Sequence, residues 1–128
     1  MLKYSGMDTK QATDVFEALS SGVRLDVFRL LVKHAPEGLV AGEIARRLGV
    51  TNTNLSFHLK AILHVGLIAV EKEGRFLRYR ANIPMMLDTI EYLTAECCLG
   101  HPEECRKYRA GRPVSIAVLP ECGCGEAE

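Results

Sequence analysis

Three cysteines close to the C-terminal end of the chain carry its most distinctive chemistry. Cys97 and Cys98 are adjacent, and Cys105 follows them after a short stretch that contains Gly100 and Pro102. Thiolates are the ligands that soft and borderline metal ions prefer, and a glycine and a proline let the chain fold back on itself. The spacing therefore indicates a site for a thiol-seeking ion at these three cysteines.

Two other chemistries would use the same thiols. His101 lies among them, so that Cys97, Cys98, His101 and Cys105 form a Cys₃His set with the spacing of a tetrahedral zinc or cadmium site. A disulfide between Cys97 and Cys98, or between Cys98 and Cys105, would instead make a redox switch. The remaining alternative is structural, with Cys97 packed as a small apolar side chain beside two incidental thiols.

The segment from residue 40 to residue 82 has the pattern of a DNA-binding element. The expected elements are a helix over residues 41–48, a sharp turn at Gly49, a helix from Thr51 or Asn52 to Val65, and strands over residues 67–72 and 76–81. Helix, turn, helix and hairpin in this order predict a winged helix-turn-helix, which lays its second helix in the DNA major groove.

Helical patterns flank this segment on both sides. We expect helices over about residues 9–19 and 22–34 before it, and one that begins near Pro84 after it. The last helix carries an apolar stripe of Met86, Leu87, Ile90, Leu93, Thr94 and Cys97. The predicted fold is mainly α with a small β-hairpin, in the order α-α-α-α-β-β-α. Because the first and last helices offer more apolar surface than one small domain can cover, we expect a homodimer.

We expect one domain and a tail. Residues 1–109 would form the DNA-binding and dimerisation domain that also holds the thiol site, and residues 110–128 would be weakly ordered apart from a short strand at residues 114–119. Cys122 and Cys124 lie in this tail. They are expected to have a secondary role, either as additional ligands or as scavengers of metal.

Charge is distributed unevenly along a chain whose net charge is zero. Residues 40–82 contain seven lysines and arginines against three glutamates, whereas residues 83–128 contain four basic and eight acidic side chains. Positive charge is thus concentrated in the segment where a phosphate backbone would lie.

The helix that follows Gly49 divides into an apolar face and a polar face. The polar face carries Thr53, Phe57, Lys60, Ala61 and His64, with Asn54 and Ser56 on its flanks. A face of this composition suits a groove in DNA better than a protein core, although Phe57 could equally be a peripheral core aromatic. We expect His58 and His34 to be surface or cap residues.

The hairpin has the pattern of a basic wing. Arg78 and Arg80 share one face of its second strand, while Leu77, Tyr79 and Ala81 share the other. Together with Lys72 and Arg75, these arginines are expected to contact phosphates or the minor groove.

Composition argues against several classes of protein. No apolar run approaches the roughly 18 residues that a membrane span needs, and the N-terminal residues have no signal-peptide pattern, so we expect a cytoplasmic protein in a reducing compartment. No histidine is paired with a nucleophile and a carboxylate, and no glycine loop of the phosphate-binding type is present, which argues against an enzyme. A winged helix used only for contact with other proteins stays open as an alternative.

Three blocks of sequence resemble the arsenic-repressor (ArsR/SmtB) family of metalloregulators. FEALSSGVRLDVFRLLV is similar to the first two helices of the family, NTNLSFHLKAILHVGLI to its recognition helix, and EGRFLRYRAN to its wing. The resemblance covers roughly residues 12–100. It implies a homodimer built on the first and last helices, a palindromic operator in double-stranded DNA, and DNA contacts at Asn52, Thr53, Ser56 and Phe57.

The chain departs from the two commonest sensor sites of that family. The helix before the recognition helix reads GLVAGEIA and has no Cys-x-Cys pair, and the last helix has Asp88 and Glu91 but no histidine. CCLGHPEEC resembles a third arrangement, with three thiols at the end of the last helix. It implies As(III), or Sb(III), as the inducer in a trigonal site of three sulfurs, with Zn(II) or Cd(II) as the alternative.

The expected switch starts from the last helix. Neighbouring helical residues point about 100° apart, so Cys97 and Cys98 could not both reach one ion while the last turn stays helical. Arsenite would therefore unwind or bend the end of that helix, disturb the dimer and release the DNA.

Overall fold

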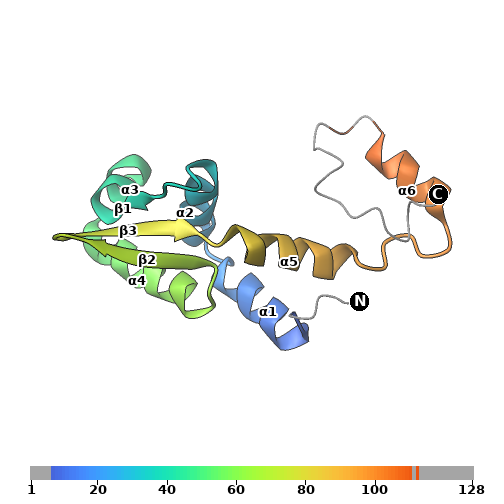
Figure 1. Cartoon of the computed structure of the whole chain (residues 1–128), viewed down its shortest axis with the longest axis horizontal. Coiled ribbons are helices and arrows are strands. Elements are labelled where there is room, and N and C mark those ends of the chain that lie inside the picture. Colours follow the sequence, from blue (N-terminus) through green and yellow to red (C-terminus); the bar gives the residue numbers. More distant parts are fainter. Residues whose placement is uncertain (1–6, 111, 113–128) are drawn as a thin grey trace. The chain divides into compact units, whose positions relative to one another are not determined.

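The computed structural model describes residues 7–110 and 112. Its elements are α1 (Thr9–Ala18), α2 (Gly22–Lys33), β1 (Leu39–Val40), α3 (Ala41–Leu48), α4 (Asn52–His64), β2 (Ile68–Glu73), β3 (Phe76–Ala81), α5 (Ile83–Thr94) and α6 (Pro102–Arg109) (Figure 1). Residues 9–86 form one compact unit, and the residues from Leu87 onward belong to a second. No helix among the described residues is both long and apolar enough to span a membrane.

Short polar side chains and one glycine set the ends of the helices in the first unit. The hydroxyl of Thr51 accepts a hydrogen bond from the Asn54 amide at 3.1 Å and so caps α4, an interaction that typically stabilises a helix by about 1 kcal/mol. Ser21 caps α2 in the same way. Gly49 ends α3 with a left-handed φ of 68°, which glycine adopts without a steric penalty. The helix boundaries expected around Gly49 are confirmed, with Thr51 as the cap.

The core of the first unit receives side chains from all four of its helices and from the sheet. Leu55, Leu59 and Ile62 form the inner face of α4, and each is at most 2% exposed. They pack in one cluster with apolar residues of α2 and α3. Burying a side chain of this size typically contributes about 1.5–3 kcal/mol, so the inner face fixes the orientation of α4 and leaves its outer face to solvent.

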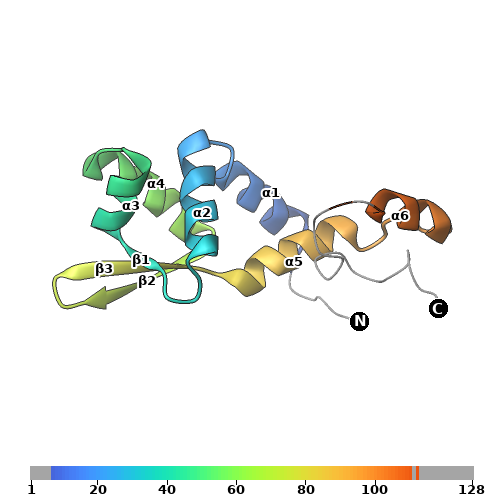
Figure 2. The ribbon, with the colours of Figure 1, turned by 90° about the horizontal axis from the view of Figure 1, so that it is seen from above.

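The sheet has three antiparallel strands in the order β1-β3-β2 (Figure 1). The helices α2, α3 and α4 lie on one side of it (Figure 2). The hairpin aligns Ile68 with Ala81 and Glu73 with Phe76, one residue beyond the expected end of the first strand. The strand β1 was not expected from the sequence, because a strand of two residues is too short to show alternation. Gly38, just before β1, has a φ of 74°, and a Cβ there would lie 2.2 Å from the Tyr79 carbonyl oxygen, so no larger residue fits this approach to β3.

The second unit corrects the expected course of the last helix. α5 ends at Thr94 and does not reach Cys97. The amides of Cys97 and Leu99 donate to carbonyls three residues earlier, Thr94 and Glu96, as in successive tight turns. Cys98 has a φ of 55°, a left-handed conformation that an α-helix cannot contain. The apolar stripe therefore ends one turn before the thiols.

The helix α6 was not expected from the sequence. It begins at Pro102, which suits the first position of a helix. Two glutamates occupy its first turn, and its last turn contains Arg106, Lys107 and Arg109, which matches the direction of the helix dipole. This signal was present in a stretch interpreted only as charged. Apart from residues 110 and 112, the tail expected at residues 110–128 lies outside the described residues, and so do its expected strand at residues 114–119 and Cys122 and Cys124.

Candidate nucleic-acid interface and thiol site

The outer face of α4 presents the side chains expected to contact DNA. Thr53, Phe57, Lys60 and His64 are exposed along it, and so are Asn52, Asn54 and Ser56 near its start. Phe57 is 65% exposed, so the alternative of a peripheral core position is wrong. Because three buried side chains hold the opposite face, these groups form a fixed surface.

A hydrogen bond ties α4 to α2 beside this surface. The Nε of Arg24 donates to the Nδ1 of His58 at 3.2 Å, and both side chains are partly buried. The ring of His58 also meets the ring of Phe57 edge-on, with centroids 5.5 Å apart and planes at 71°. His58 was expected to be a simple surface or cap residue, and the structure instead gives it two partners. His34 does cap the end of α2.

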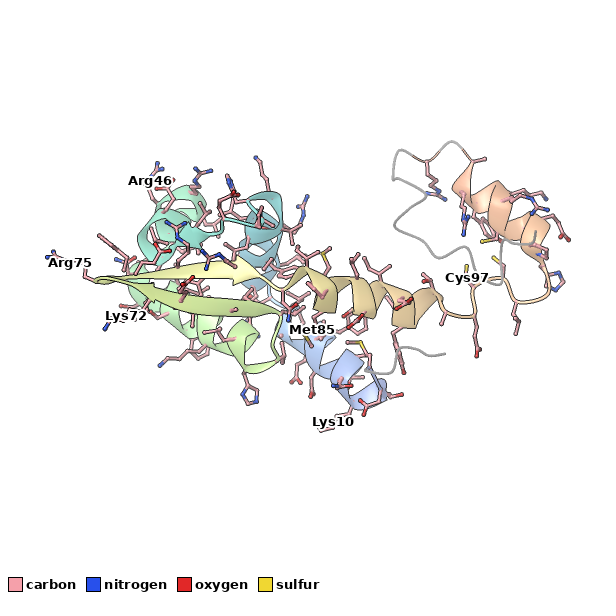
Figure 3. The ribbon with its side chains drawn as sticks, viewed as in Figure 1. Lys10, Arg46, Lys72, Arg75, Met85 and Cys97 are labelled. Atoms are coloured by element: carbon pink, nitrogen blue, oxygen red, sulfur yellow. The ribbon has the colours of Figure 1, made fainter. Side chains whose placement is uncertain are left out.

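The hairpin carries exposed positive charge at its far end. Arg75 lies at the turn between β2 and β3, next to Gly74, and Lys72 lies close to it on β2 (Figure 3). Both side chains are exposed, and no ion pair of theirs is found in the part of the chain that the structure describes. These two cations are therefore available to an external anion.

The other two arginines of the wing are engaged within the protein. The Nε of Arg78 donates to Glu73 at 2.9 Å, and its Nη1 donates to the carbonyl oxygen of Gly38 at 3.2 Å. Arg80 forms an ion pair with Glu71 and donates from its Nε to the Pro36 carbonyl oxygen at 3.2 Å. These contacts brace the hairpin against the turn before β1. The glutamates neutralise part of the positive charge that, from the sequence alone, was expected to face DNA.

The charges of α3 are paired in a similar way. Glu43 accepts hydrogen bonds from Arg47 and Arg46, which lower the pKa of its carboxyl group. The net charge of residues 40–82 thus overstates the number of cations that face solvent freely.

In the core of the first unit, burial raises the pKa of the Tyr79 phenol.

The three thiols expected to bind an ion come together in the second unit. The Sγ of Cys97 lies 3.5 Å from that of Cys98 and 3.9 Å from that of Cys105, and all three sulfurs lie within 4.8 Å of one another. Cys105, on α6, is 3% exposed. Cys97 lies in the segment after α5 (Figure 3). The left-handed backbone at Cys98 allows the adjacent thiols of Cys97 and Cys98 both to face Cys105 on α6.

The spacing of the sulfurs fits a small ion. Metal–sulfur bonds of about 2.3 Å at tetrahedral angles place ligand sulfurs about 3.8 Å apart. The distances from the Cys97 sulfur to those of Cys98 and Cys105 lie on either side of this value. A small movement would bring the sulfurs of Cys98 and Cys105 to the same separation. His101 is exposed and does not belong to the group of converging ligand atoms among the described residues. The donor set is therefore three sulfurs, and the Cys₃His arrangement is not assembled.

Known proteins match the first unit most clearly. A family model described as a helix-turn-helix domain matches residues 19–71. The Bacillus subtilis protein YceK, an HTH-type transcriptional regulator, is 35% identical over 77 residues, which cover 56% of this chain and 76% of YceK. The transcriptional repressor SdpR of the same organism is 26% identical over 62% of this chain and 86% of SdpR.

The fold is also similar to solved structures of transcriptional regulators. An ArsR-like transcriptional regulator from Rhodococcus sp. RHA1 superposes with a TM-score of 0.62 at 25% identity, over 82% of this chain and 96% of that protein. The order of helices, the turn at Gly49 and the hairpin agree with a winged helix-turn-helix. The chain belongs to the ArsR family of winged helix-turn-helix transcriptional regulators.

Proposed function

We propose that this regulator is a repressor that binds a palindromic DNA site as a homodimer and releases it when As(III) binds Cys97, Cys98 and Cys105. The observation that carries the proposal is the convergence of three thiols within 4.8 Å, with no histidine in the group. A cluster of this composition selects a thiophilic ion.

The exposure of side chains on α4 and on the hairpin supports a DNA-facing surface on these two elements. Asn52, Thr53, Asn54 and Ser56 lie at the start of α4, where side chains of a recognition helix reach base edges. Farther along α4, Phe57, Lys60 and His64 continue the same surface, and Lys72 and Arg75 extend it onto the wing. Arg78 and Arg80 would reach phosphates only by leaving their carboxylate partners.

The dimer is supported by apolar side chains that a single chain leaves exposed. Leu87 and Leu93 on α5 are 47% and 62% exposed, and Phe16 on α1 is 43% exposed. Pairing of first and last helices across a twofold axis would cover such residues. It would also set the two recognition helices about 34 Å apart, one turn of DNA.

As(III) is favoured over zinc by the number of ligands. Zinc in structural sites takes four ligands, and three thiols with no converging histidine leave its coordination incomplete. As(III) is satisfied by three sulfurs, with its lone pair in place of a fourth ligand. Sb(III) would use the same set, so we expect both ions to act as inducers.

The switch would work by closing the cluster rather than by unwinding α5. The helix already ends at Thr94, so Cys97 and Cys98 need not leave it to meet one ion. Drawing the sulfurs together would shift α6 and the turn at residues 95–101 against the end of α5. Because α5 is proposed to form the dimer, the spacing of the recognition helices would change. A coupling of about 1–3 kcal/mol between ion and DNA is typical of such systems.

The test is DNA binding measured by fluorescence anisotropy, with and without arsenite. Wild-type protein should bind a duplex that it selects from a random pool, its affinity should fall steeply with salt, and arsenite should release it. Variants in which Cys97, Cys98 or Cys105 is replaced singly by Ser should bind the same duplex but should no longer release it when arsenite is added. Release by zinc but not arsenite would favour the zinc or cadmium alternative. A monomer without affinity for any duplex would leave only a role in protein–protein contact.

A further inference from the structure

The exposed aromatic side chain in the middle of α4 is the most unusual feature of the DNA-facing surface. Phe57 is 65% exposed, although a phenylalanine in solvent has nothing to gain from water. It lies one turn after Thr53, about 6 Å farther along the helix axis, which corresponds to about two base pairs. Its neighbours Lys60 and Thr53 on this face can form hydrogen bonds, and Phe57 cannot.

We propose that Phe57 reads the C5-methyl group of a thymine in the major groove. The edges of base pairs there present hydrogen-bond donors, hydrogen-bond acceptors and one apolar feature, which is the thymine methyl group. A phenyl ring can recognise only the last of these. The inference rests on the proposed function, because it requires α4 to enter the major groove.

The ring of Phe57 is held ready for such a contact. The edge-on packing against His58 restricts where the phenyl ring can point. His58 is fixed in turn, because its Nδ1 accepts the hydrogen bond from Arg24, a residue of α2. Arg24 and His58 are thus positioning residues that would lower the entropy lost when Phe57 meets the base.

The experiment uses the full chain and a duplex that the wild-type protein has selected from a random pool. Each thymine is replaced in turn by deoxyuridine, which lacks only the methyl group. At one thymine in each half-site, wild-type affinity should fall about fourfold, the factor expected when one methyl group is no longer hidden from water. Replacement in both half-sites should lower it about fifteenfold.

Variants of Phe57 then test whether this side chain causes the loss of affinity for the deoxyuridine duplex. Phe57→Ala should bind thymine and uracil duplexes equally, whereas Phe57→Leu, which keeps an apolar side chain, should retain part of the preference. Arg24→Ala and His58→Ala should reduce the thymine-to-uracil ratio while salt-dependent binding persists. A general loss of stability would weaken both duplexes alike, so the ratio isolates the positioning role.

Two results would overturn the inference alone. One is a uracil effect of the same size in Phe57→Ala and wild type, and the other is a selected duplex in which no thymine responds to the change. In both cases DNA binding and its release by arsenite would still stand. Absence of binding to every duplex would overturn the proposed function and this inference with it.

Discussion

The unit formed by residues 9–86 and the residues from Leu87 onward are stabilised in different ways. The first has a continuous apolar core to which four helices and a sheet contribute. Among residues 87–110, only Thr89 and Cys105 are buried, and one of these is a proposed ligand. A region with few buried apolar side chains opens at low free-energy cost. The surface proposed to read DNA therefore belongs to a well-packed unit, and the proposed thiol site belongs to a part whose stability would depend on its ligand.

The largest difference between the two regions should come from removing an apolar side chain. Leu59→Ala in α4 should lower the free energy of unfolding by about 2–5 kcal/mol, because it leaves a cavity in the core. Leu99→Ala is the matched control, since Leu99 is 67% exposed in the thiol-bearing region. Its effect should stay within about 0.5 kcal/mol. Chemical denaturation measures both, and equal losses would contradict the comparison.

Arsenite should stabilise the thiol-bearing region selectively. At a free concentration of 100 times its dissociation constant, a ligand stabilises the form that binds it by about 2.7 kcal/mol. Amide hydrogen exchange in residues 95–110 should then slow by up to about a hundredfold, while exchange in α4 changes little. Cys105→Ser should abolish the protection. Protection spread evenly over α4 and α6 would mean that the two regions fold as one.

Removing the cap of α4 should have an intermediate effect on the well-packed unit. Thr51→Ala should lower the free energy of unfolding by about 1 kcal/mol, since the Asn54 amide loses its acceptor. Thr51→Ser retains a hydroxyl group and should remain close to wild type. Thermal unfolding provides the measurement. An Ala variant as stable as the Ser variant would show that the cap contributes nothing.

The smallest effects should separate the two kinds of arginine on the wing. Arg75→Ala should weaken every duplex alike and reduce the slope of log affinity against log salt by about 0.9 for each phosphate that the variant no longer neutralises. Arg78→Ala should leave that slope unchanged and lower the free energy of unfolding by less than about 1 kcal/mol, because Arg78 is occupied by Glu73 and Gly38. An equal fall in slope for both variants would mean that both arginines contact DNA phosphates.

Local signals in the sequence were sufficient for the well-packed unit. The apolar spacing of Leu55, Leu59 and Ile62 predicted the inner face of α4, and Gly49 predicted the turn before it. The alternation along β3 placed Tyr79 inward. The partners of Arg78 and Arg80 could not be predicted in this way, because they depend on the strand register and on a turn that lies far away in the sequence.

The sequence identified the three cysteines that converge in the structure, but the backbone expected to carry them was wrong. Residue types identified Cys97, Cys98 and Cys105, and the structure brings their sulfurs together. Helical periodicity carried the apolar stripe on to Cys97, whereas the chain turns at Thr94. Periodicity cannot reveal such an end when no glycine or proline marks it. The link between Arg24 and His58 was missed because the two residues lie on different helices.

The short strand β1 has a consequence for the DNA. It pairs with β3 and runs directly into α3, so the wing and the helix-turn-helix share one hydrogen-bonded frame. A wing held in this way cannot swing to follow the contour of a duplex. Adjustment at the interface would then fall to the nucleic acid, whose bending stiffness varies with base sequence. Base steps that no side chain touches would contribute to operator choice through the energy needed to deform them.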